Sequence, residues 1–333
     1  MSTRITARSW SRATELIRQS GSFAIGTHIR PDGDAIGSLL GLALALEKSG
    51  RRASALVADP APPSYRFLPG AERLLSLPPE WTAEVGIAVD CDGIGRLGSL
   101  APAFAALPHL IDVDHHQTEH LFGEVQLIDP RAAATGEIVY HLLRRAGLPI
   151  DAEVATCLYT AILTDTGRFC FGNTTASALR LAGELVKAGA QPERIARRIY
   201  EDRSIAATHL LGLALSRLSA ELEGWLVTST LTQQDFARTN AAPSDTEGII
   251  DHLRAIGGPR VAMLLVEPNH EGVRISLRSD GSVDVSEIAL RFGGGGHRMA
   301  AGCTVPGRAE EVRRRIIDAI GDAFSRPGGP HAG

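Results

Sequence analysis

Short apolar segments alternate with helix-forming segments over roughly the first 190 residues of this chain. Strand-like runs are "SFAIGT", "ASALVAD", "VGIAVD" and "HLIDVD", and "GEVQLID" has the character of an edge strand. Helical patterns cover residues 35–48, 135–146, 152–163 and 176–188. Strands that alternate with helices form parallel sheets covered on both faces. We therefore predict an α/β fold with a parallel sheet for this part.

A second, smaller α/β domain is predicted after a long helical stretch. A helix is expected from residue 192 to about residue 221, because Pro192 suits a first helical turn. The strand-like runs "WLVTSTL", "RVAMLLVEP" and "GVRISLRS" follow, with a helix at residues 246–256, a glycine-rich loop and a final helix at 309–323. We predict a first domain at residues 1–190, a linker helix at 191–220, a second domain at 221–325 and a disordered tail at 326–333.

Size and composition indicate an ordinary globular protein. The chain has 333 residues, of which 44% are hydrophobic and 22% charged. The longest apolar run, residues 39–46, is too short to cross a bilayer, and the N-terminal arginines lack the apolar stretch of a secretory signal. The 4 cysteines show no CxxC spacing and are expected to be reduced thiols. We predict a cytoplasmic protein with no membrane partner.

The net charge of −4 argues against a protein that holds long nucleic acids. It leaves small phosphorylated ligands open, because local charge can differ from the total.

Acids and histidines gather where the predicted strands end. Ligands of open parallel sheets bind beyond the carboxyl ends of the strands, so side chains that follow different strands meet there. A further acid, Asp165 in "ILTDTGRF", follows an apolar helix. The residues that follow three of the strands are His28, Asp32, Asp34, Asp90, Asp114, His115 and His116.

This mixture of groups predicts a divalent-metal site. Several carboxylates in one crevice repel one another, and cations relieve that repulsion. Carboxylates and imidazoles without a thiolate favour Mn²⁺ or Mg²⁺ over structural zinc, with Co²⁺ as a substitute. About seven ligand groups suit two ions roughly 3.5–4 Å apart that share one carboxylate.

Simpler interpretations remain open for each motif alone. Asp32 and Asp34 could form a turn and cap the following helix. The "DHH" run could be a surface loop, and the glycines at 293–296 could be a flexible turn. The metal-site hypothesis depends on all the acidic segments occurring together.

The motifs "HIRPDGDAIGS", "VDCDGIGRLG", "VDHH" and "TDTGRF", in that order, resemble those of the DHH phosphoesterase superfamily. The C-terminal "FGGGGHRMAAG" resembles the signature of its DHHA1 domain. The layout is similar to that of the bacterial nano-RNase (oligoribonuclease) branch. Its members remove mononucleotides from very short oligonucleotides, and many dephosphorylate 3′-phosphoadenosine 5′-phosphate or degrade linear dinucleotides.

The resemblance implies a role for each matching residue. One Mn²⁺ is assigned to His28, Asp32 and Asp90, and a second to Asp34, Asp90, His115 and Asp165. Asp114 is expected to orient a ligating histidine, and His116 to contact the scissile phosphate. Substrate contacts are expected from the other matching residues, namely Arg96, Arg278, Gly294, Gly295, Gly296 and His297.

Some of these residues have a second interpretation. Arg96 could face the substrate or only stabilise its loop. Asn173 and Thr174 are expected to cap the next helix rather than to serve the site. Cys91 lies beside a ligand but is expected to point away from the metals and to be packing.

The sequence therefore predicts a manganese-dependent hydrolase that acts in a cleft between two domains on short RNA, linear dinucleotides or 3′-phosphoadenosine 5′-phosphate. A homodimer is also considered. The alternatives are a dedicated 3′-phosphoadenosine 5′-phosphate phosphatase, a RecJ-like exonuclease and a non-catalytic nucleotide sensor. A family-two inorganic pyrophosphatase would share the N-terminal motifs but not the glycine-rich ending.

Overall fold

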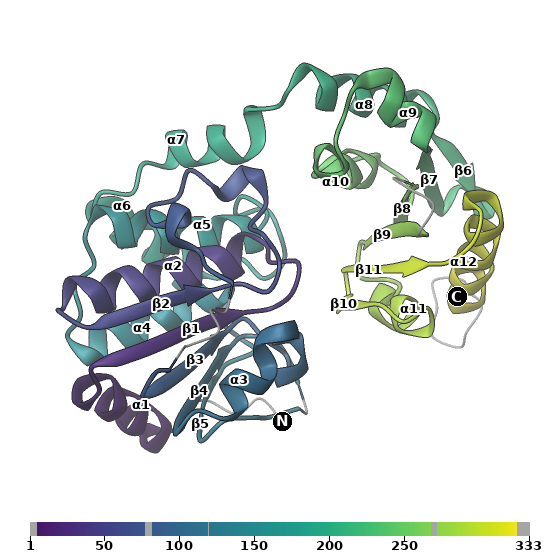
Figure 1. Cartoon of the computed structure of the whole chain (residues 1–333). Coiled ribbons are helices and arrows are strands. Elements are labelled where there is room, and N and C mark those ends of the chain that lie inside the picture. The colour runs from purple at the N-terminus through teal and green to yellow at the C-terminus, as the bar shows by residue number, and fades with distance from the viewer. Residues whose placement is uncertain (1–4, 77–81, 119, 268–271, 325–333) are drawn as a thin grey trace. The chain divides into compact units, whose positions relative to one another are not determined.

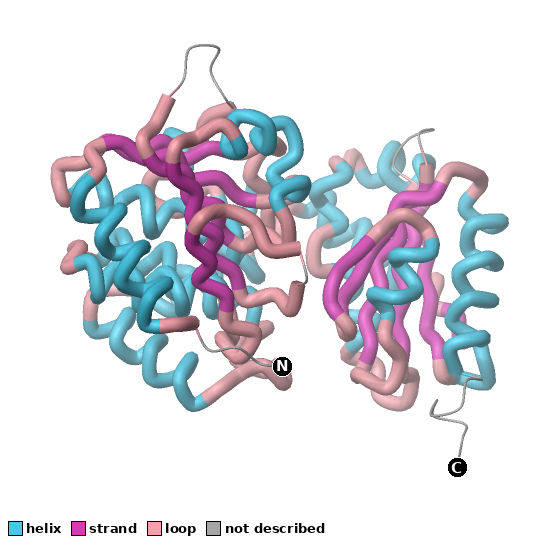
Figure 2. The backbone as a smooth tube through the Cα atoms, turned by 90° about the horizontal axis from the view of Figure 1, so that it is seen from below, coloured by secondary structure: helices cyan, strands magenta, loops and turns pink. Residues whose placement is uncertain are grey.

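The structure is a computed structural model that describes residues 5–76, 82–118, 120–267 and 272–324. The chain divides into two compact units, Met1–Glu201 and Asp202–Gly333 (Figure 1). This division falls inside the predicted linker at residues 191–220, and the predicted tail lies outside the described residues. Each unit has its own sheet with helices packed against it (Figure 2).

The first unit contains the predicted parallel sheet. Its strands are β1 (Ser22–Thr27), β2 (Arg52–Leu56), β3 (Val85–Val89), β4 (His109–Asp114) and β5 (Val125–Ile128), in the order β2-β1-β3-β4-β5. All four pairings are parallel, and β5 is the edge strand that the sequence predicts. Because β1, β3 and β4 are neighbours, the segments that follow them meet at one edge of the sheet.

Helices cover both faces of this sheet. The helices are α1 (Ala7–Gln19), α2 (Gly33–Lys48), α3 (Ala101–Ala105), α4 (Thr135–Ala146), α5 (Ala152–Asp165), α6 (Ala176–Lys187) and α7 (Pro192–Ala196). Large side chains such as Ile25, Ile87 and Val113 belong to the core formed with α1, α2, α4 and α5. Small ones such as Ala24 and Ala88 face α3 and its buried Phe104. Burial on both faces explains the continuous apolar runs of the strands.

Helices α2 and α5 approach each other closely along a row of glycines. A Cβ added at Gly33 would lie 2.5 Å from Thr164, and one at Gly37 would lie 2.5 Å from the carbonyl oxygen of Cys157. Gly41 follows one turn later against Leu158. Side chains four residues apart lie on one helix face, so only glycines allow this contact along the helix. The contact brings the first turn of α2 beside the last turn of α5.

The second unit contains a mixed sheet in the order β10-β11-β9-β8-β7-β6. Its strands are β6 (Ser219–Glu221), β7 (Leu226–Leu231), β8 (Val261–Val266), β9 (Val273–Ser279), β10 (Gly295–His297) and β11 (Ala300–Val305). Helices α8 (Ile205–Ser216), α9 (Gln233–Thr239) and α10 (Ile249–Arg254) pack on one face. Helices α11 (Val285–Arg291) and α12 (Ala309–Phe324) pack on the other. The predicted smaller α/β domain is confirmed.

The predicted helix from residue 192 to 221 is wrong as a single element. Helix α7 runs into a π-helical turn, Arg197–Glu201, and the chain then leaves helical geometry. Ser204 starts α8, because its side chain accepts a hydrogen bond from the N–H of Ala207. The predicted glycine loop is also partly a strand, since β10 pairs with β11.

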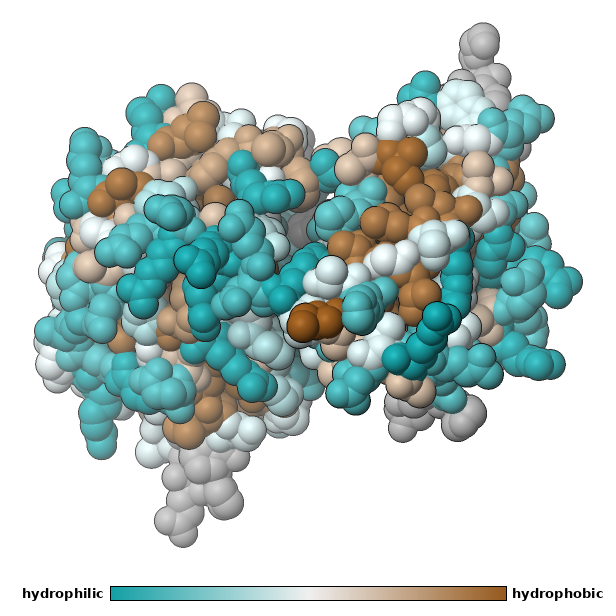
Figure 3. Space-filling view, turned by 90° about the horizontal axis from the view of Figure 1, so that it is seen from above, coloured by the Kyte–Doolittle hydropathy of each residue, from teal (hydrophilic) through white to brown (hydrophobic). Residues whose placement is uncertain are grey.

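Helix α8 carries apolar residues on its exposed side as well as its buried side. Ile205 is 78% exposed, and Leu215 is also exposed, as is Leu218 just after the helix. Figure 3 views this side of the molecule and shows apolar residues in brown over the second unit. Among the described residues, no helix combines the length and apolar character needed to cross a membrane.

Candidate metal centre

A first group of candidate ligands is formed by the segments after β1 and β3. It consists of His28, Asp32 and Asp90, each of which offers an atom within 4.8 Å of the others. His28 Nδ1 lies 2.8 Å from the carbonyl oxygen of Ile29, so this nitrogen carries the proton. His28 Nε2 then faces the acids, 3.5 Å from Asp90 Oδ2 and 4.0 Å from Asp32 Oδ1.

Asp32 also has the simpler role that the sequence left open. It is the N-cap of α2, because its Oδ1 accepts a hydrogen bond from the N–H of Ala35 at 3.1 Å. Its side chain nevertheless lies in the first ligand group. The helix start therefore fixes the position of a candidate ligand.

A second group consists of Asp34, His115 and Asp165. His115 Nδ1 lies 3.3 Å from the carbonyl oxygen of Ala132. Its Nε2 faces Asp165 Oδ2 at 3.6 Å and Asp34 Oδ2 at 3.8 Å. Asp165 is the last residue of α5 and not part of a turn after the helix. The close contact between α2 and α5 places Asp34 and Asp165 in one group.

Asp90 faces both groups. Its Oδ2 lies 3.5 Å from His28 Nε2, and its Oδ1 lies 3.7 Å from His115 Nε2. The residue is buried and has a left-handed backbone with φ of 61°. This conformation is uncommon for residues with a side chain, and aspartate is one of those that adopt it most readily.

Asp114 holds the neighbouring histidine pair. Its Oδ1 accepts hydrogen bonds from the backbone N–H groups of His115 and His116, and from His116 Nδ1 at 2.6 Å. It thus orients the ring of His116, whereas Ala132 orients the ring of His115. His116, with Asp90 and His115, forms a third group of possible ligands.

Burial and mutual repulsion act on the acids of the second group. Burial raises the pKa of Asp34 well above its usual value, and the charges of Asp90 and Asp165 raise it further. Burial also raises the pKa of Asp165. The charge of His115 lowers this pKa, whereas the charges of Asp32 and Asp90 raise it, and the pKa is about 7. Both acids therefore tend to hold protons in the absence of a cation.

The first group behaves in the opposite way. Burial alone would raise the pKa of Asp90, but hydrogen bonding to His28 and the charge of His116 bring it below its usual value. Burial lowers the pKa of His28, yet the hydrogen bond to Asp90 and the charge of Asp32 raise it to about 9. A proton on His28 thus balances the negative charge of Asp90. A bound metal ion could replace that proton and supply the same positive charge.

The donors fit a divalent cation. Carboxylate oxygens and imidazole nitrogens converge from several elements, and none of the three groups contains a thiol. The first two groups, taken together with Asp90 between them, provide the six side chains that the resemblance assigns to metals.

Two polar residues beside these groups were not predicted. Asn173, expected to cap α6, instead donates from Nδ2 to the backbone oxygen of Asp165 and to the carbonyl oxygen of Ala133, both at 3.0 Å. The cap of α6 is Thr175. Thr135, at the start of α4, donates to Asp90. The predicted helix starts at residues 135 and 176 could have pointed to these two residues. Polar residues near those starts lie close to the edge of the sheet where the acids gather.

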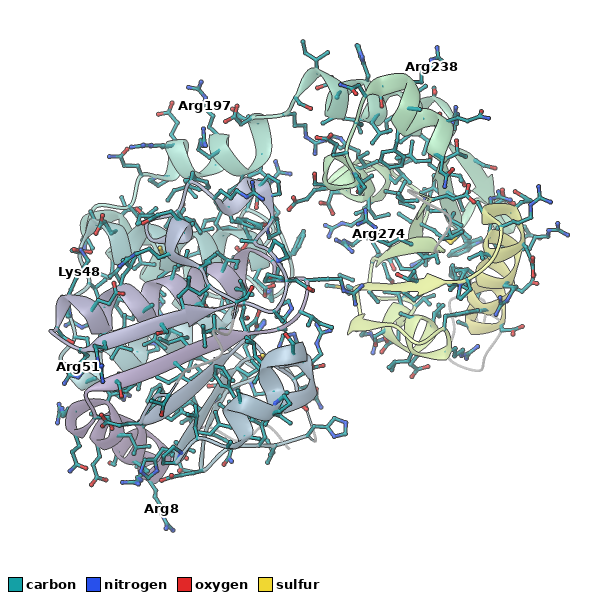
Figure 4. The ribbon with its side chains drawn as sticks, viewed as in Figure 1. Arg8, Lys48, Arg51, Arg197, Arg238 and Arg274 are labelled. Atoms are coloured by element: carbon teal, nitrogen blue, oxygen red, sulfur yellow. The ribbon has the colours of Figure 1, made fainter. Side chains whose placement is uncertain are left out.

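The predicted substrate residues of the second unit lie on β9 and on or just before β10, with β11 between these two strands. Arg278 is on β9, opposite Ala300 of β11, and Ala300 is opposite His297 of β10. Arg278 Nε lies 3.5 Å from Asp251 Oδ1. The side chain of His297 lies outside the described residues. Arg274, labelled in Figure 4, is on the same face of β9 and donates to Thr246.

The glycines before and within β10 differ in whether packing leaves room for a side chain. A Cβ at Gly294 would collide with the carbonyl oxygen of Gly302, and one at Gly296 would lie 2.5 Å from that of Ala300. Packing on β11 therefore explains both residues. A Cβ at Gly295 would meet no described atom within 4 Å, so packing does not explain that glycine.

Arg96 and Cys91 lie beside the first group. Arg96 pairs with Asp92 at 3.2 Å, and its backbone oxygen accepts from the N–H of Ile29 at 2.8 Å, next to His28. The loop of Arg96 thus supports the loop of His28. Cys91 is buried, its Sγ contacts the carbonyl oxygen of Val89, and burial raises the pKa of its thiol. This environment fits the predicted packing role.

The sequence matches known families over both units. Residues 22–162 match the DHH family, N-terminal domain, and residues 226–326 match the DHHA1 domain. "Bifunctional oligoribonuclease and PAP phosphatase NrnA" of Thermus thermophilus is 37% identical over 314 residues, which cover 92% of each chain. The Bacillus subtilis protein of the same name is 27% identical over 88% of this chain and 93% of its own.

Solved structures have the same architecture. An exopolyphosphatase-related protein from Bacteroides fragilis has a TM-score of 0.90 at 25% identity, over 98% of this chain and 100% of its own. RecJ of Thermus thermophilus, solved in complex with Mn²⁺, has a TM-score of 0.55 at 16% identity, over 98% of this chain and 56% of its own. The likeness to RecJ is one of fold.

Proposed function

Because the chain belongs to the DHH family and carries a DHHA1 domain, we propose that it is a phosphoesterase that hydrolyses short oligoribonucleotides to mononucleotides. We further propose that it dephosphorylates 3′-phosphoadenosine 5′-phosphate, in line with the names of its relatives. The observation that carries the proposal is the position of Asp90, which belongs to the first ligand group and lies 3.7 Å from His115 of the second.

The cofactor we propose is two Mn²⁺ ions, with Mg²⁺ or Co²⁺ as substitutes. One ion would be held by His28, Asp32 and Asp90. The second ion would be held by Asp90 together with the three ligands of the second group. The ions would supply positive charge that activates water and neutralises a phosphoryl group. The remaining ligands are Asp34, His115 and Asp165.

His116 is the proposed hydrogen-bond donor to the scissile phosphate. Burial lowers the pKa of His116, but the hydrogen bond to Asp114 and the charge of Asp90 raise it to about 10, so the ring holds a proton at neutral pH. Because Nδ1 is held by Asp114, Nε2 is the ring nitrogen that would face the substrate. Asp114 therefore acts through His116.

The second unit is proposed to hold the far end of the substrate. Arg278 would contact a phosphate, and the backbone near Gly295 and His297 would approach the ligand. Arg96 would contribute from the first unit. A substrate held at both ends must be short, so the rate should fall with length, and an acidic protein offers long strands few further phosphate contacts.

The test is a product time course with Mn²⁺ on RNAs of two, five and twenty-four nucleotides and on 3′-phosphoadenosine 5′-phosphate. We expect mononucleotides from the two shorter RNAs, phosphate release from the nucleotide, and a much lower rate on the longest strand. Equal efficiency on the longest strand, with processive products, would favour a RecJ-like exonuclease. Turnover of the nucleotide alone would indicate a dedicated phosphatase, and no turnover a sensor.

Asp90→Asn provides the inactive control and a prediction of its own. Asparagine tolerates a left-handed backbone, so the fold should persist. Loss of the shared carboxylate should lower kcat/KM by more than about 100-fold and remove bound metal. Metal content and turnover on the purified variant measure both effects, and two bound ions with a near-normal rate would disprove the shared role.

A cytoplasmic location and a homodimer remain predictions. Fractionation of cells that express the tagged chain would measure the first, and sedimentation velocity would measure the second.

A further inference from the structure

Helix α4 has no cap of its own. Its N-cap residue, Ala134, has a methyl group that cannot accept a hydrogen bond. The first two N–H groups of the helix donate instead to Asp34 of α2, from Thr135 to Oδ2 at 2.6 Å and from Gly136 to Oδ1 at 3.0 Å. All three residues are buried. A carboxylate from another helix thus takes the position of a capping side chain.

These contacts limit how Asp34 can bind a metal. A carboxylate oxygen has two in-plane lone pairs. Asp34 Oδ1 accepts from both Gly136 N–H and Ser38 Oγ, the latter at 2.9 Å. Asp34 Oδ2 accepts from Thr135 N–H and is the oxygen that faces His115 Nε2. Oδ2 is therefore the atom of Asp34 that remains for a cation.

The side chain of the same threonine acts on the shared acid. Thr135 Oγ1 donates to Asp90 Oδ1 at 2.9 Å, and both residues are buried. One lone pair of Oδ1 then remains toward His115 Nε2, while Oδ2 faces His28 Nε2. This hydrogen bond holds the carboxylate so that each oxygen serves a different ligand group.

The segment that carries Thr135 is itself fixed in place. Glu137 accepts from the N–H of Ala133 at 3.1 Å and from Ser177 Oγ at 2.5 Å. The carbonyl oxygens of Ala132 and Ala133 reach His115 and Asn173. A rigid segment can therefore orient several candidate ligands at once.

We infer that Thr135 is a positioning residue whose hydroxyl orients Asp90, and whose backbone N–H orients Asp34, for divalent-metal binding. The inference rests on the ligand set of the proposed function. It predicts that the hydroxyl matters for metal affinity, while the backbone contact survives any substitution that keeps the helix start.

The test compares Thr135→Val with Thr135→Ser. Valine has nearly the shape of threonine and keeps the N–H but loses the hydroxyl, whereas serine keeps both. Thr160→Val is the matched control, because Thr160 is equally buried and its hydroxyl donates only within α5, to the carbonyl oxygen of Thr156. Calorimetric titration of the metal-free proteins with Mn²⁺ gives affinity and stoichiometry. Unfolding in EDTA reports whether each variant is folded.

We expect Thr135→Val to bind Mn²⁺ about 10- to 100-fold more weakly than the wild type. Thr135→Ser and Thr160→Val should stay within about threefold of the wild type. Thr135→Ala gives the same comparison if the valine variant does not fold. Wild-type affinity in the folded variant that lacks the hydroxyl, or an equal loss in the serine variant, would overturn the inference. A wild type that binds no Mn²⁺ would instead overturn the proposed ligand set.

Discussion

The pKa values of buried residues in the first unit determine how the stability of the metal-free protein depends on pH. The folded pKa of Asp165 is about 7, against roughly 4 when unfolded, so its destabilising charge appears as pH rises from 4 to 7. The folded pKa of His28 is about 9, so its stabilising proton is fully present below about 6.5 and is lost as pH rises through 9. Asp34 acts in the same direction as Asp165.

We therefore expect the metal-free protein to lose stability steadily between about pH 4 and pH 9. Urea unfolding in EDTA at several pH values measures this trend. Added Mn²⁺ should reverse it at the alkaline end, because the metal takes the place of the protons. Stability in EDTA that rises with pH across this range would contradict the assignment of the proton-holding groups.

Asp112 is another buried acid, and its effect is separate from those of the candidate metal ligands. It lies on β4, fully buried, opposite Ala88 of β3, and neither of its carboxylate oxygens has a hydrogen-bond partner among the described residues. Burial, together with the negative charges of Asp114 and Asp92, raises the pKa of Asp112 to about 9. The charge of His116 acts in the opposite direction. The side chain therefore holds a proton at neutral pH in the folded state.

Asp112→Asn should stabilise the protein at alkaline pH. The wild-type acid costs stability as pH rises from about 4 to 9, by up to about 1.4 kcal/mol per pH unit, and asparagine does not ionise. The difference in unfolding free energy between the two proteins should be small near pH 4 and grow with pH. A difference that does not change with pH would mean that Asp112 keeps its ordinary pKa.

At the scale of elements, the close contact of α2 and α5 connects packing with metal binding. Gly37→Ala would force a methyl group against the carbonyl oxygen of Cys157. We expect a loss of about 1–3 kcal/mol in unfolding free energy and weaker Mn²⁺ binding, because Asp34 would move away from Asp165. Denaturant unfolding and metal titration measure the two effects.

Gly183→Ala on α6 is the control for that substitution. Gly183 is exposed, and a Cβ there would meet nothing within 4 Å, so alanine should add about 0.5–1 kcal/mol. If both substitutions have the same effect, then the helix contact does not depend on the absence of a Cβ at Gly37.

The sequence correctly predicted those helices and strands that short stretches of apolar and polar residues specify. The alternation of apolar strands with helices was enough for the parallel sheet and for its edge strand β5. The neighbouring strand ends then brought together acids and histidines that are up to 137 residues apart, from His28 to Asp165. Strand ends are predictable because the register of a parallel sheet places them at one edge.

Other features depend on contacts that no local pattern records. The role of Asn173 follows from how the turn after α5 folds back, since its amide reaches Asp165 and Ala133. The break after Glu201 occurs in a segment with uniform helical character, where the chain passes from one unit to the other. In both cases tertiary structure overrides the local preference.

At the scale of the whole molecule, the two units should separate metal binding from substrate binding. Arg278→Ala in the second unit should leave Mn²⁺ affinity unchanged but lower kcat/KM for a dinucleotide by roughly 10- to 100-fold, the cost of losing a charged hydrogen bond. Arg238→Ala is the control, because this side chain points into solvent from α9 (Figure 4). Loss of metal in the Arg278 variant would contradict the division of roles.

The capping of α4 by Asp34 changes how related sequences should be read. A descendant that had lost all hydrolytic activity would still need an acceptor for the first N–H groups of α4, since its own Ala134 provides none. Selection for folding alone would then preserve Asp34. An aspartate at this position is therefore poor evidence that a relative is still an enzyme. Within the described parts of the chain, neither His28 nor Asp165 caps a helix in this way, so their loss would be clearer evidence of an inactive site.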